Sequence, residues 1–563
     1  MCCCPPSSFV ARPPPRRNRR RPDLEGADVG HYRNPILPGC HPDPSVCRVG
    51  ADVYLVTSTF EYLPGLPIHV SRNMVDWSLV GHAIERPGQL DLAALPSSRG
   101  LFAPTIRHDG ERFHVVCTVV GPDGDSWAGR TGHFVVTALD AAGPWTDPVW
   151  IDGVGGFDPS LTFDGDRVWL TGTEPAVRPQ WPGQTDVWLV ELDPATYQPS
   201  TTPVVIWRGA LLGGVWAEGP HIMRRPGGGW MLVAAEGGTA REHAVCVAYA
   251  DEIAGPYRGD PGNPRLTHRD LGRRAPIASV GHADLVDDGA GNTWATVLAT
   301  RPVDGRDGLL GRQTHLVSVD WEDARPVFAP GVGRVRIDND APGVPDQSAQ
   351  TSVFADDFGG QRLDLAWNGV GRHPSTFAVP GDAAGQLTLR AGAEPSSLGP
   401  QSFLGRRLPS ERARITVVLE VPDAAGAGDV RGGLLLRTSE QAYLEVSVDR
   451  GGVVRCTSMS RSTLHNHAEV AGFCDRLEIG LDVRDLVAFV TVDGAPIAEI
   501  DLAFLVPDPG SGFVGVWVGP LAVGDPRASV IITSTTVALA DAAEAQRLLE
   551  PGASHDEIVL TAP

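Results

Sequence analysis

A chain of 563 residues is long enough for at least two domains, and its formal net charge of −21 argues against nucleic acid or an anionic membrane as a partner. The sequence contains no lysine, so all 47 basic residues are arginines, which excludes Schiff-base chemistry and a Walker-type phosphate loop. A soluble protein that acts on a neutral molecule, such as a sugar, fits this composition.

Residues 1–30 form an arginine- and proline-rich leader that begins with three cysteines. We expect it to be disordered, because it has almost nothing to bury. Palmitoylated cysteines beside the basic run would make it a membrane anchor, and a start codon assigned too far upstream would explain it equally well. Without a signal peptide or transmembrane segment, we expect a cytoplasmic protein whose nine cysteines are free thiols.

Five short segments of similar pattern recur through residues 31–338, and consecutive segments are separated by 60, 55, 61 and 63 residues. They are residues 43–46, 103–106, 158–161, 219–222 and 282–285. Each is followed by a glycine-containing turn and an aromatic-rich strand, as in a β-hairpin. A repeat of this length holds four short strands, so the pattern predicts an all-β domain, a five-bladed β-propeller.

Equivalent positions of a propeller repeat face the central channel, so they converge although they are far apart in sequence. Asp43, Asp158 and His282 share one repeat position, and Glu218 is offset from it by one residue. Three carboxylates directed at one mouth shift one another's pKa, and a glycosidase needs such a protonated acid beside an ionised base. One Asp-Pro pair alone would be a turn or a strand start, but its recurrence favours catalysis.

The residues around each carboxylate suggest separate roles. Asp43 lies between two prolines, and this rigid position suits a general base that holds a water molecule. Glu218 has apolar neighbours and two converging aspartates, which would raise its pKa as a general acid requires. Asp158 would orient the substrate and hold up the pKa of Glu218.

Four further residues have both a structural and a functional interpretation. His282 would be a core histidine, a substrate contact or a ligand of a cation in the channel. Phe60 and Phe102 would pack within a blade or stack on a sugar ring. Arg312 would be a surface charge or would grip sugar hydroxyls. No cofactor is predicted, although a structural calcium or other cation in the channel is compatible with the sequence.

Residues 339–350 are rich in Pro, Gly and Asp and predict a linker. Residues 351–540 alternate apolar and polar positions without repeats, and Asp493-Gly494 between two such runs is a hairpin signal. Many antiparallel strands of this kind predict a β-sandwich of the jelly-roll, concanavalin-like kind. The tail, residues 541–563, begins with an Ala- and Glu-rich stretch that would form one short helix.

At these residues the sequence resembles glycoside hydrolase family 43, in particular its β-xylosidase and α-L-arabinofuranosidase branch with a C-terminal β-sandwich. The resemblance extends from about residue 32 to about residue 539. The matching stretches are Asn34-Pro35-Ile36-Leu37-Pro38-Gly39, His41-Pro42-Asp43-Pro44-Ser45, Thr57-Ser58-Thr59-Phe60-Glu61, Pro64-Gly65, Pro67-Ile68-His69, Ala103-Pro104-Thr105-Ile106-Arg107, Phe157-Asp158-Pro159-Ser160, Glu218-Gly219-Pro220-His221, Ala235-Glu236-Gly237-Gly238-Thr239 and Gly281-His282-Ala283-Asp284.

The resemblance implies single-displacement hydrolysis with inversion, with Asp43 as base, Asp158 as pKa modulator and Glu218 as acid. Inversion needs the acid and base carboxyls roughly 6.5 to 9.5 Å apart. It also implies that Phe60 lines the subsite of the terminal sugar and that His282 and Arg312 hold this sugar from the channel side. Relatives often have Trp or Tyr where Phe102 stands, and an aromatic residue in place of Cys40 and Leu63, so the sugar preference is open.

The resulting hypothesis is an exo-acting, inverting glycosidase that releases xylose from the non-reducing ends of short β-1,4-xylooligosaccharides. An α-L-arabinofuranosidase, or an enzyme with both activities, is the near alternative. A non-catalytic propeller that binds glycans is the alternative from another class. The expected partner is a small oligosaccharide, and a homo-oligomer is compatible with the sequence.

Overall fold

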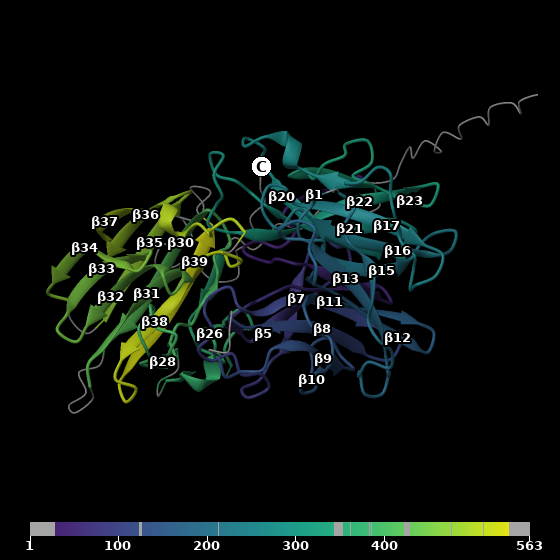
Figure 1. The fold of residues 1–563 in the computed structure, drawn as a ribbon. Helices are drawn as coiled ribbons and strands as arrows, with labels where there is room; N and C mark the ends of the chain where they lie inside the picture. The colour runs from purple at the N-terminus through teal and green to yellow at the C-terminus, as the bar shows by residue number, and fades with distance from the viewer. Residues whose placement is uncertain are drawn as a thin grey trace, which may run out of the picture.

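The computed structural model describes residues 29–539, apart from residues 123–126, 212, 343–352, 361, 382, 384, 422–427, 474–475 and 511. The two β-rich parts predicted from the sequence lie side by side in Figure 1. The helices of the described part are three short 3-10 turns, η1 (Arg269–Leu271), η2 (Pro374–Thr376) and η3 (Ala503–Leu505). None of the helices in these ranges is long and apolar enough to cross a membrane. The predicted tail helix and most of the predicted leader and linker lie outside the described residues.

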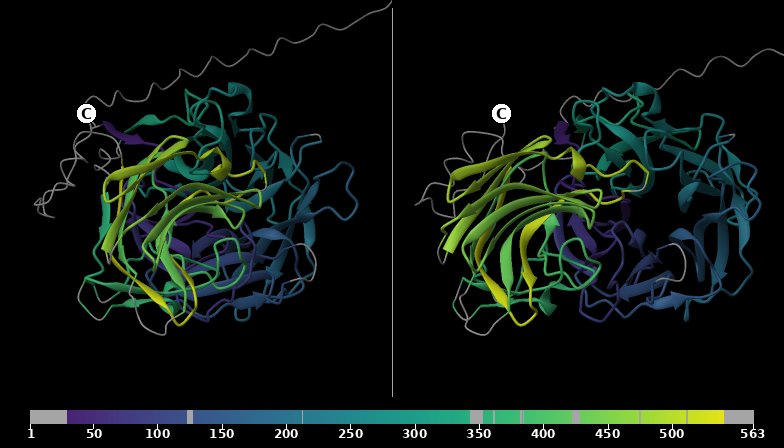
Figure 2. Two further views of the ribbon diagram at one scale, coloured as in Figure 1. Left: turned by 90° about the vertical axis from the view of Figure 1, so that its left-hand side faces the viewer. Right: turned by 60° about the vertical axis from the view of Figure 1, so that its left-hand side comes forward.

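The N-terminal part is a ring of five antiparallel sheets, as the repeat predicted, and the right-hand view of Figure 2 shows it from purple through blue to teal. The first blade contains β2 (Ser45–Val49), β3 (Asp52–Val56), β5 (Gly65–Ser71) and β6 (Ser78–Ile84). The second contains β7 (Gly100–His108), β8 (Phe113–Val120), β9 (Gly132–Ala138) and β10 (Val149–Ile151). The third contains β11 (Phe157–Asp164), β12 (Arg167–Pro175), β13 (Thr185–Leu192) and β14 (Val204–Trp207).

The last two blades complete the ring. The fourth contains β15 (Glu218–Arg224), β16 (Trp230–Glu236), β17 (Ala244–Ala250), β18 (Arg258–Gly259) and β19 (Leu266–Thr267). The fifth contains β20 (Ala278–Asp287), β21 (Thr293–Thr300), β22 (Arg312–Glu322) and β23 (Arg325–Phe328). Apolar side chains between neighbouring sheets are buried, so the core is divided among the spaces between blades.

A two-stranded sheet joins the ends of the propeller segment. It pairs β1 (Val29–Arg33) with β24 (Asp338–Pro342), so residues 29–30 and 339–342 form strands where the sequence suggested a leader and a linker. The adjoining Asn34 amide donates to the carbonyls of Leu316 and Arg336, both at 3.0 Å, and its oxygen accepts from the Leu316 N–H at 2.8 Å. These contacts attach the start of the first blade to the last blade.

The five inner strands share one unusual backbone position. Asp43, Ala103, Asp158, Gly219 and His282 have φ angles of 55°, 29°, 54°, 56° and 46°. Residues other than glycine rarely adopt this left-handed backbone conformation, and those that are held in it are often found at functional sites. In β7, β11, β15 and β20 the register also shifts at this point, and such bulges redirect side chains. The repeat therefore brings equivalent residues to one end of the channel.

The C-terminal part is a β-sandwich, coloured green to yellow in Figure 2, as the alternating pattern predicted. One sheet contains β25 (Val353–Asp356), β27 (Ala378–Pro380), β28 (Leu387–Arg390), β39 (Ser529–Leu539), β30 (Arg412–Glu420), β35 (Arg476–Arg484), β36 (Val487–Val492) and β37 (Ala495–Asp501). The other contains β29 (Arg406–Arg407), β38 (Trp517–Gly524), β31 (Val430–Ser439), β32 (Ala442–Asp449), β33 (Val453–Ser460) and β34 (Thr463–Ala471). Asp493 and Gly494 both have positive φ, which suits the tight turn of the predicted hairpin.

The propeller and the sandwich are packed together through buried residues. The short strands β4 (Tyr62–Leu63) and β26 (Gly369–Val370) pair across the boundary. The rings of Tyr62 and Trp517 stack with centroids 3.9 Å apart. Beside them, Arg437 of the sandwich forms a buried ion pair with Glu61 of the propeller at 3.3 Å. This interface also fixes the position of the sandwich loop that contains Phe513, whose N–H donates to the Ser98 hydroxyl of the propeller.

Candidate active site

Three buried carboxyl groups come from three different blades to the channel end at which the inner strands begin. Asp43 lies two residues before β2, Asp158 is the second residue of β11, and Glu218 is the first residue of β15. Their exposed fractions are 5%, 8% and 9%. These are the three residues that the sequence proposed as base, modulator and acid.

Asp43 is held by donors from both sides. The Ser58 hydroxyl donates to Oδ2 at 2.6 Å, and an N–H of the Arg312 guanidinium donates to Oδ1 at 3.0 Å. Burial alone would raise the pKa of Asp43, but Arg312, His282 and the Ser58 hydroxyl outweigh it and lower the pKa below its ordinary value. Asp43 is therefore ionised at neutral pH, and its position is fixed.

Glu218 and Asp158 show the opposite behaviour. Burial, followed by the charges of Asp158 and Asp43, raises the pKa of Glu218 well above its ordinary value. Burial also raises the pKa of Asp158 to about 6, even though His282 opposes this effect and the Gly219 N–H donates to its Oδ2 at 3.0 Å. The pocket thus combines Glu218, whose surroundings favour the protonated form, with Asp43, whose surroundings favour the ionised form.

This arrangement can perform acid–base chemistry on a bond placed between Glu218 and Asp43. A protonated carboxyl group can donate a proton to a leaving oxygen, while an ionised carboxylate can remove a proton from water. Two carboxyl groups with pKa values shifted in opposite directions are a common solution for glycosidic bond hydrolysis.

His282 and Arg312 come from the fifth blade and face the same group. His282 Nδ1 lies 3.9 Å from Asp43 Oδ1, and both side chains are buried. A Cβ atom at Gly219 would lie 2.8 Å from the His282 ring, so only glycine leaves room for the histidine beside Glu218. The structure therefore places the two predicted substrate contacts directly against the carboxylates.

The two predicted aromatic residues lie together at the mouth. The rings of Phe60 and Phe102 are 5.1 Å apart, and both contact Phe513, at 5.9 and 5.6 Å. Phe513 belongs to the sandwich, and its ring lies 5.0 Å from the Arg312 guanidinium carbon. Its backbone is anchored to the propeller, because its N–H donates to the Ser98 hydroxyl at 2.9 Å.

Phe513 and Ser58 were missed by the sequence-based prediction. Ser58 is two residues before Phe60 in a stretch that the prediction did single out, so its hydroxyl beside Asp43 could have been considered. Phe513 lies in a separate domain and in no repeat, and no sequence signal linked it to the mouth. Ser58 belongs to the propeller itself, whereas Phe513 reaches the site only because the two domains are packed together.

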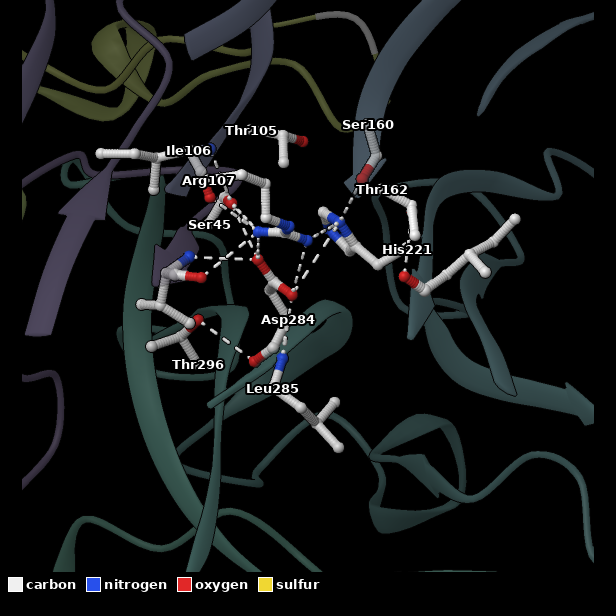
Figure 3. Close-up of polar contacts among 12 residues, drawn as sticks. Ser45, Thr105, Ile106, Arg107, Ser160, Thr162, His221, Asp284, Leu285 and Thr296 are labelled. Atoms are coloured by element: carbon white, nitrogen blue, oxygen red, sulfur yellow. Dashed lines mark hydrogen bonds and ion pairs between the residues drawn. The ribbon is translucent and has the colours of Figure 1, made fainter. Parts of the chain in front are cut away.

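A polar network joins the inner strands of the propeller, as Figure 3 shows. The Arg107 guanidinium donates to both oxygens of Asp284, at 2.8 and 3.2 Å, and lies 3.1 Å from His221 Nδ1. Ser45 donates to Asp284 at 2.8 Å, and the Ser160 hydroxyl lies 3.2 Å from His221 Nδ1. These five residues come from the inner strands of all five blades, so one network joins the whole ring.

In this network the positive charge that faces the Asp284 carboxylate is the guanidinium group of Arg107. Arg107 directly follows the second repeat segment, and the sequence-based prediction gave it no role. Among residues 29–539, outside the gaps given above, no group of three or more His, Cys, Asp or Glu side chains is arranged to hold a metal ion. The described residues therefore provide no ligand cluster for the cation considered from the sequence.

Comparison with known proteins places these features in a family. The family model "Glycosyl hydrolases family 43" matches residues 32–326, and the model "Beta xylosidase C-terminal Concanavalin A-like domain" matches residues 355–530. The xylosidase/arabinosidase of Butyrivibrio fibrisolvens is 35% identical over 519 residues, which cover 88% of this chain and 96% of that protein. The non-reducing end alpha-L-arabinofuranosidase BoGH43B of Bacteroides ovatus is 32% identical over 515 residues, which cover 88% and 92%.

Solved structures agree with this assignment. The xylan beta-1,4-xylosidase of Bacillus halodurans superimposes with a TM-score of 0.81 at 26% identity, covering 90% of this chain and all of the other. The Bacteroides ovatus xyloglucan-locus GH43B protein gives the same TM-score at 29% identity, with the same coverage. Both the propeller and the sandwich are therefore shared with these proteins, and the chain belongs to glycosyl hydrolases family 43.

Proposed function

We propose that this enzyme is an exo-acting, inverting glycosidase that releases xylose from the non-reducing ends of short β-1,4-xylooligosaccharides. The observation that carries the proposal is that Asp43 and Glu218 are both buried at one channel end, with neighbours that shift their pKa values in opposite directions. Relatives named as β-xylosidases or xylosidase/arabinosidases, matched along most of the chain, support the choice of sugar.

In the proposed mechanism, Glu218 gives its proton to the glycosidic oxygen as the bond from that oxygen to the anomeric carbon breaks. Asp43 takes a proton from a water molecule, and the water oxygen bonds to the anomeric carbon from the opposite face. The products are a xylose of inverted configuration and a chain shortened by one sugar. Proton transfer from solvent to Glu218 and from Asp43 to solvent restores the enzyme.

The remaining residues of the pocket would hold the terminal sugar. Arg312 both fixes Asp43 and presents donors beside the Phe60 ring, and His282 lies on the channel side. Phe513 of the sandwich packs against Phe60 and Phe102 at this site, and a second domain so close to the site would favour binding of a chain end over the middle of a chain. Asp158, whose own pKa is raised to about 6, would raise the pKa of Glu218 by its negative charge.

An α-L-arabinofuranosidase is the second candidate. A relative named as a non-reducing end alpha-L-arabinofuranosidase matches 88% of this chain. A furanose and a pyranose can present similar hydroxyls to donors such as those of Arg312, and the same acid and base would hydrolyse either. The pocket chemistry is common to both candidates, so the substrate assay decides between them.

The first experiment compares 4-nitrophenyl β-D-xylopyranoside, 4-nitrophenyl α-L-arabinofuranoside and xylobiose as substrates of the wild-type enzyme, Asp43→Asn and Glu218→Gln. We expect xylose release, with inversion visible by NMR of the first product. Asp43→Asn should lower kcat roughly a thousandfold on both 4-nitrophenyl β-D-xylopyranoside and xylobiose. Glu218→Gln should lower kcat/KM by roughly 10²–10⁴-fold on xylobiose and less on the nitrophenyl substrate, whose leaving group needs little protonation.

Each other outcome has a distinct meaning. A preference for the arabinofuranoside would favour the second candidate. Retention of configuration would contradict the single-displacement mechanism. Folded wild-type protein that cleaves none of the three substrates but binds xylooligosaccharides would favour the glycan-binding alternative.

A further inference from the structure

Trp216 stands out among the tryptophans of this chain because its side chain is exposed. All 14 tryptophans lie in the described part, and the other 13 are buried or half-buried, whereas Trp216 is 39% exposed. It lies two residues before Glu218. Core packing does not account for an exposed aromatic side chain so close in sequence to the candidate acid.

The strand directions place Trp216 at the channel mouth. Inner strands begin at the mouth, so the second strand of each blade ends there. The loops that follow β12 and β16 therefore also lie at the mouth, and both contact this residue. The backbone N–H of Trp216 donates to the carbonyl of Gly183 in the first loop, and a Cβ atom at Gly238 of the second loop would lie only 3.3 Å from the Trp216 ring.

The backbone that carries Trp216 is held on several sides. The Trp216 N–H bond to Gly183 is 2.8 Å long, and the Gly237 N–H donates to the carbonyl of Val215 at 2.8 Å. The Trp181 indole N–H donates to the carbonyl of Gly214, also at 2.8 Å. Trp216 itself has a φ of 52°, a conformation that costs free energy for a side chain of this size. The ring is therefore presented to solvent on a fixed support.

Phe157 extends the same surface. Its ring centroid lies 6.3 Å from that of Trp216, and it directly precedes Asp158. The pair thus flanks the candidate acid and its modulator. The cluster of Phe60, Phe102 and Phe513 instead lies beside Arg312, which holds the candidate base. Aromatic side chains thus lie beside both members of the proposed acid–base pair, and on the Glu218 side one of them, Trp216, is exposed.

We propose that Trp216, supported by Phe157, is the platform on which the leaving-group sugar of the substrate stacks. The inference rests on the proposed function and adds a second binding subsite to it. In a single displacement the water attacks from the Asp43 side, so the leaving group departs on the Glu218 side, where Trp216 lies. A flat indole face suits the C–H face of a xylose ring, and this stacking gives the enzyme a preference for chains over small glycosides.

The test measures kcat/KM for xylobiose and for methyl β-D-xylopyranoside, whose leaving group is too small to reach the platform. We expect Trp216→Ala to lower the ratio of the two values roughly tenfold, the size of a lost aromatic stacking contact. Trp216→Phe should restore most of this ratio. The matched control is Val177→Ala, an exposed residue of the loop after β12, which should leave the ratio as in the wild type.

The outcomes separate this proposal from the proposed function. A Trp216→Ala variant whose two kcat/KM values fall by the same factor would overturn the platform and leave a structural role. If the wild type prefers arabinofuranosides, the xylose assignment fails, and the same comparison is made with a disaccharide and a methyl glycoside of arabinofuranose. A wild-type enzyme that hydrolyses neither sugar would overturn both proposals.

Discussion

The three carboxyl groups of the pocket are similarly buried, yet their pKa values shift differently because their neighbours differ. A guanidinium, an imidazole and a hydroxyl surround Asp43 and lower its pKa despite burial. Two carboxylates face Glu218, and they add to the effect of burial on its pKa. The charges nearest to each group thus account for the proposed roles of acid and base.

The role of Asp158 can be tested with Asp158→Asn, which removes one negative charge beside Glu218. Activity requires protonated Glu218, so it is lost as the pH rises through the pKa of this group. Since Asp158 raises that pKa, the variant should lose activity at a lower pH than the wild type. The acidic limb, which follows the lowered pKa of Asp43, should stay in place. Profiles of kcat/KM against pH for both proteins measure this.

A positioning role alone would give another result. In that case Asp158→Asn would lower kcat/KM at every pH and leave both limbs where they were. Asp158→Glu, which retains the charge, serves as the matched variant and should keep the basic limb close to that of the wild type. The two aspartate variants together separate the effect of charge from that of shape.

At the scale of elements, the start of each inner strand combines a left-handed residue with a bulge, and the channel network joins the strands below it. Ser45, Arg107, Ser160, His221 and Asp284 connect the five blades by polar contacts, in addition to the apolar packing between the blades. Burial would raise the pKa of Asp284, but Arg107 and His221 lower it to about 2. This carboxylate therefore contributes stability above its unfolded-state pKa, and the contribution is lost as the pH falls toward 2.

Asp284→Asn should destabilise the propeller, because it leaves the guanidinium of Arg107 without its counter-charge in the channel. Removing one partner of a buried ion pair typically costs about 3–5 kcal/mol. The matched control is Asp287→Asn on the same strand, whose pair with Arg48 is exposed and should contribute about 1 kcal/mol or less. Urea unfolding at pH 7, followed by tryptophan fluorescence, compares both variants with the wild type. Equal midpoints for the two variants would contradict a structural role of the network.

At the scale of the whole molecule, the sandwich completes the mouth of the propeller. Tyr62 stacks on Trp517 and Glu61 pairs with Arg437 at the buried interface, so the loop with Phe513 has a defined position. Phe513 then contacts Phe60, Phe102 and Arg312. The candidate site is therefore shared by the two domains, although all three carboxyl groups belong to one.

Phe513→Ala tests this sharing. The variant removes a ring that lies over the Arg312 guanidinium and packs on Phe60, so we expect kcat/KM for xylobiose to fall roughly tenfold, mainly through KM. Leu464→Ala, an exposed position on β34, is the control and should behave as the wild type. Thermal unfolding of both variants checks that the domains remain docked. Wild-type kinetics for Phe513→Ala would show that the sandwich does not take part in substrate binding.

The sequence by itself determined the fold class and the three carboxyl groups, because both are recorded in a repeat that can be read along the chain. The spacing of the five repeat segments predicts the blades, and equivalent positions in a closed ring must meet. The Asp493-Gly494 turn and the alternating strands likewise depend on neighbours in the sequence. Local patterns of this kind need no knowledge of distant contacts.

Only the tertiary structure decided what surrounds those groups. Arg312 reaches Asp43 from 269 positions away, Phe513 comes from another domain, and Arg107 meets Asp284 across the channel. The protonation states depend on these distances, since the interaction of two charges falls with their separation and grows as water is excluded. The exposed face of Trp216 was likewise decided by the loops that support it. The order of residues along the chain does not indicate such contacts, because they form only when the propeller ring has closed and the sandwich has docked against it.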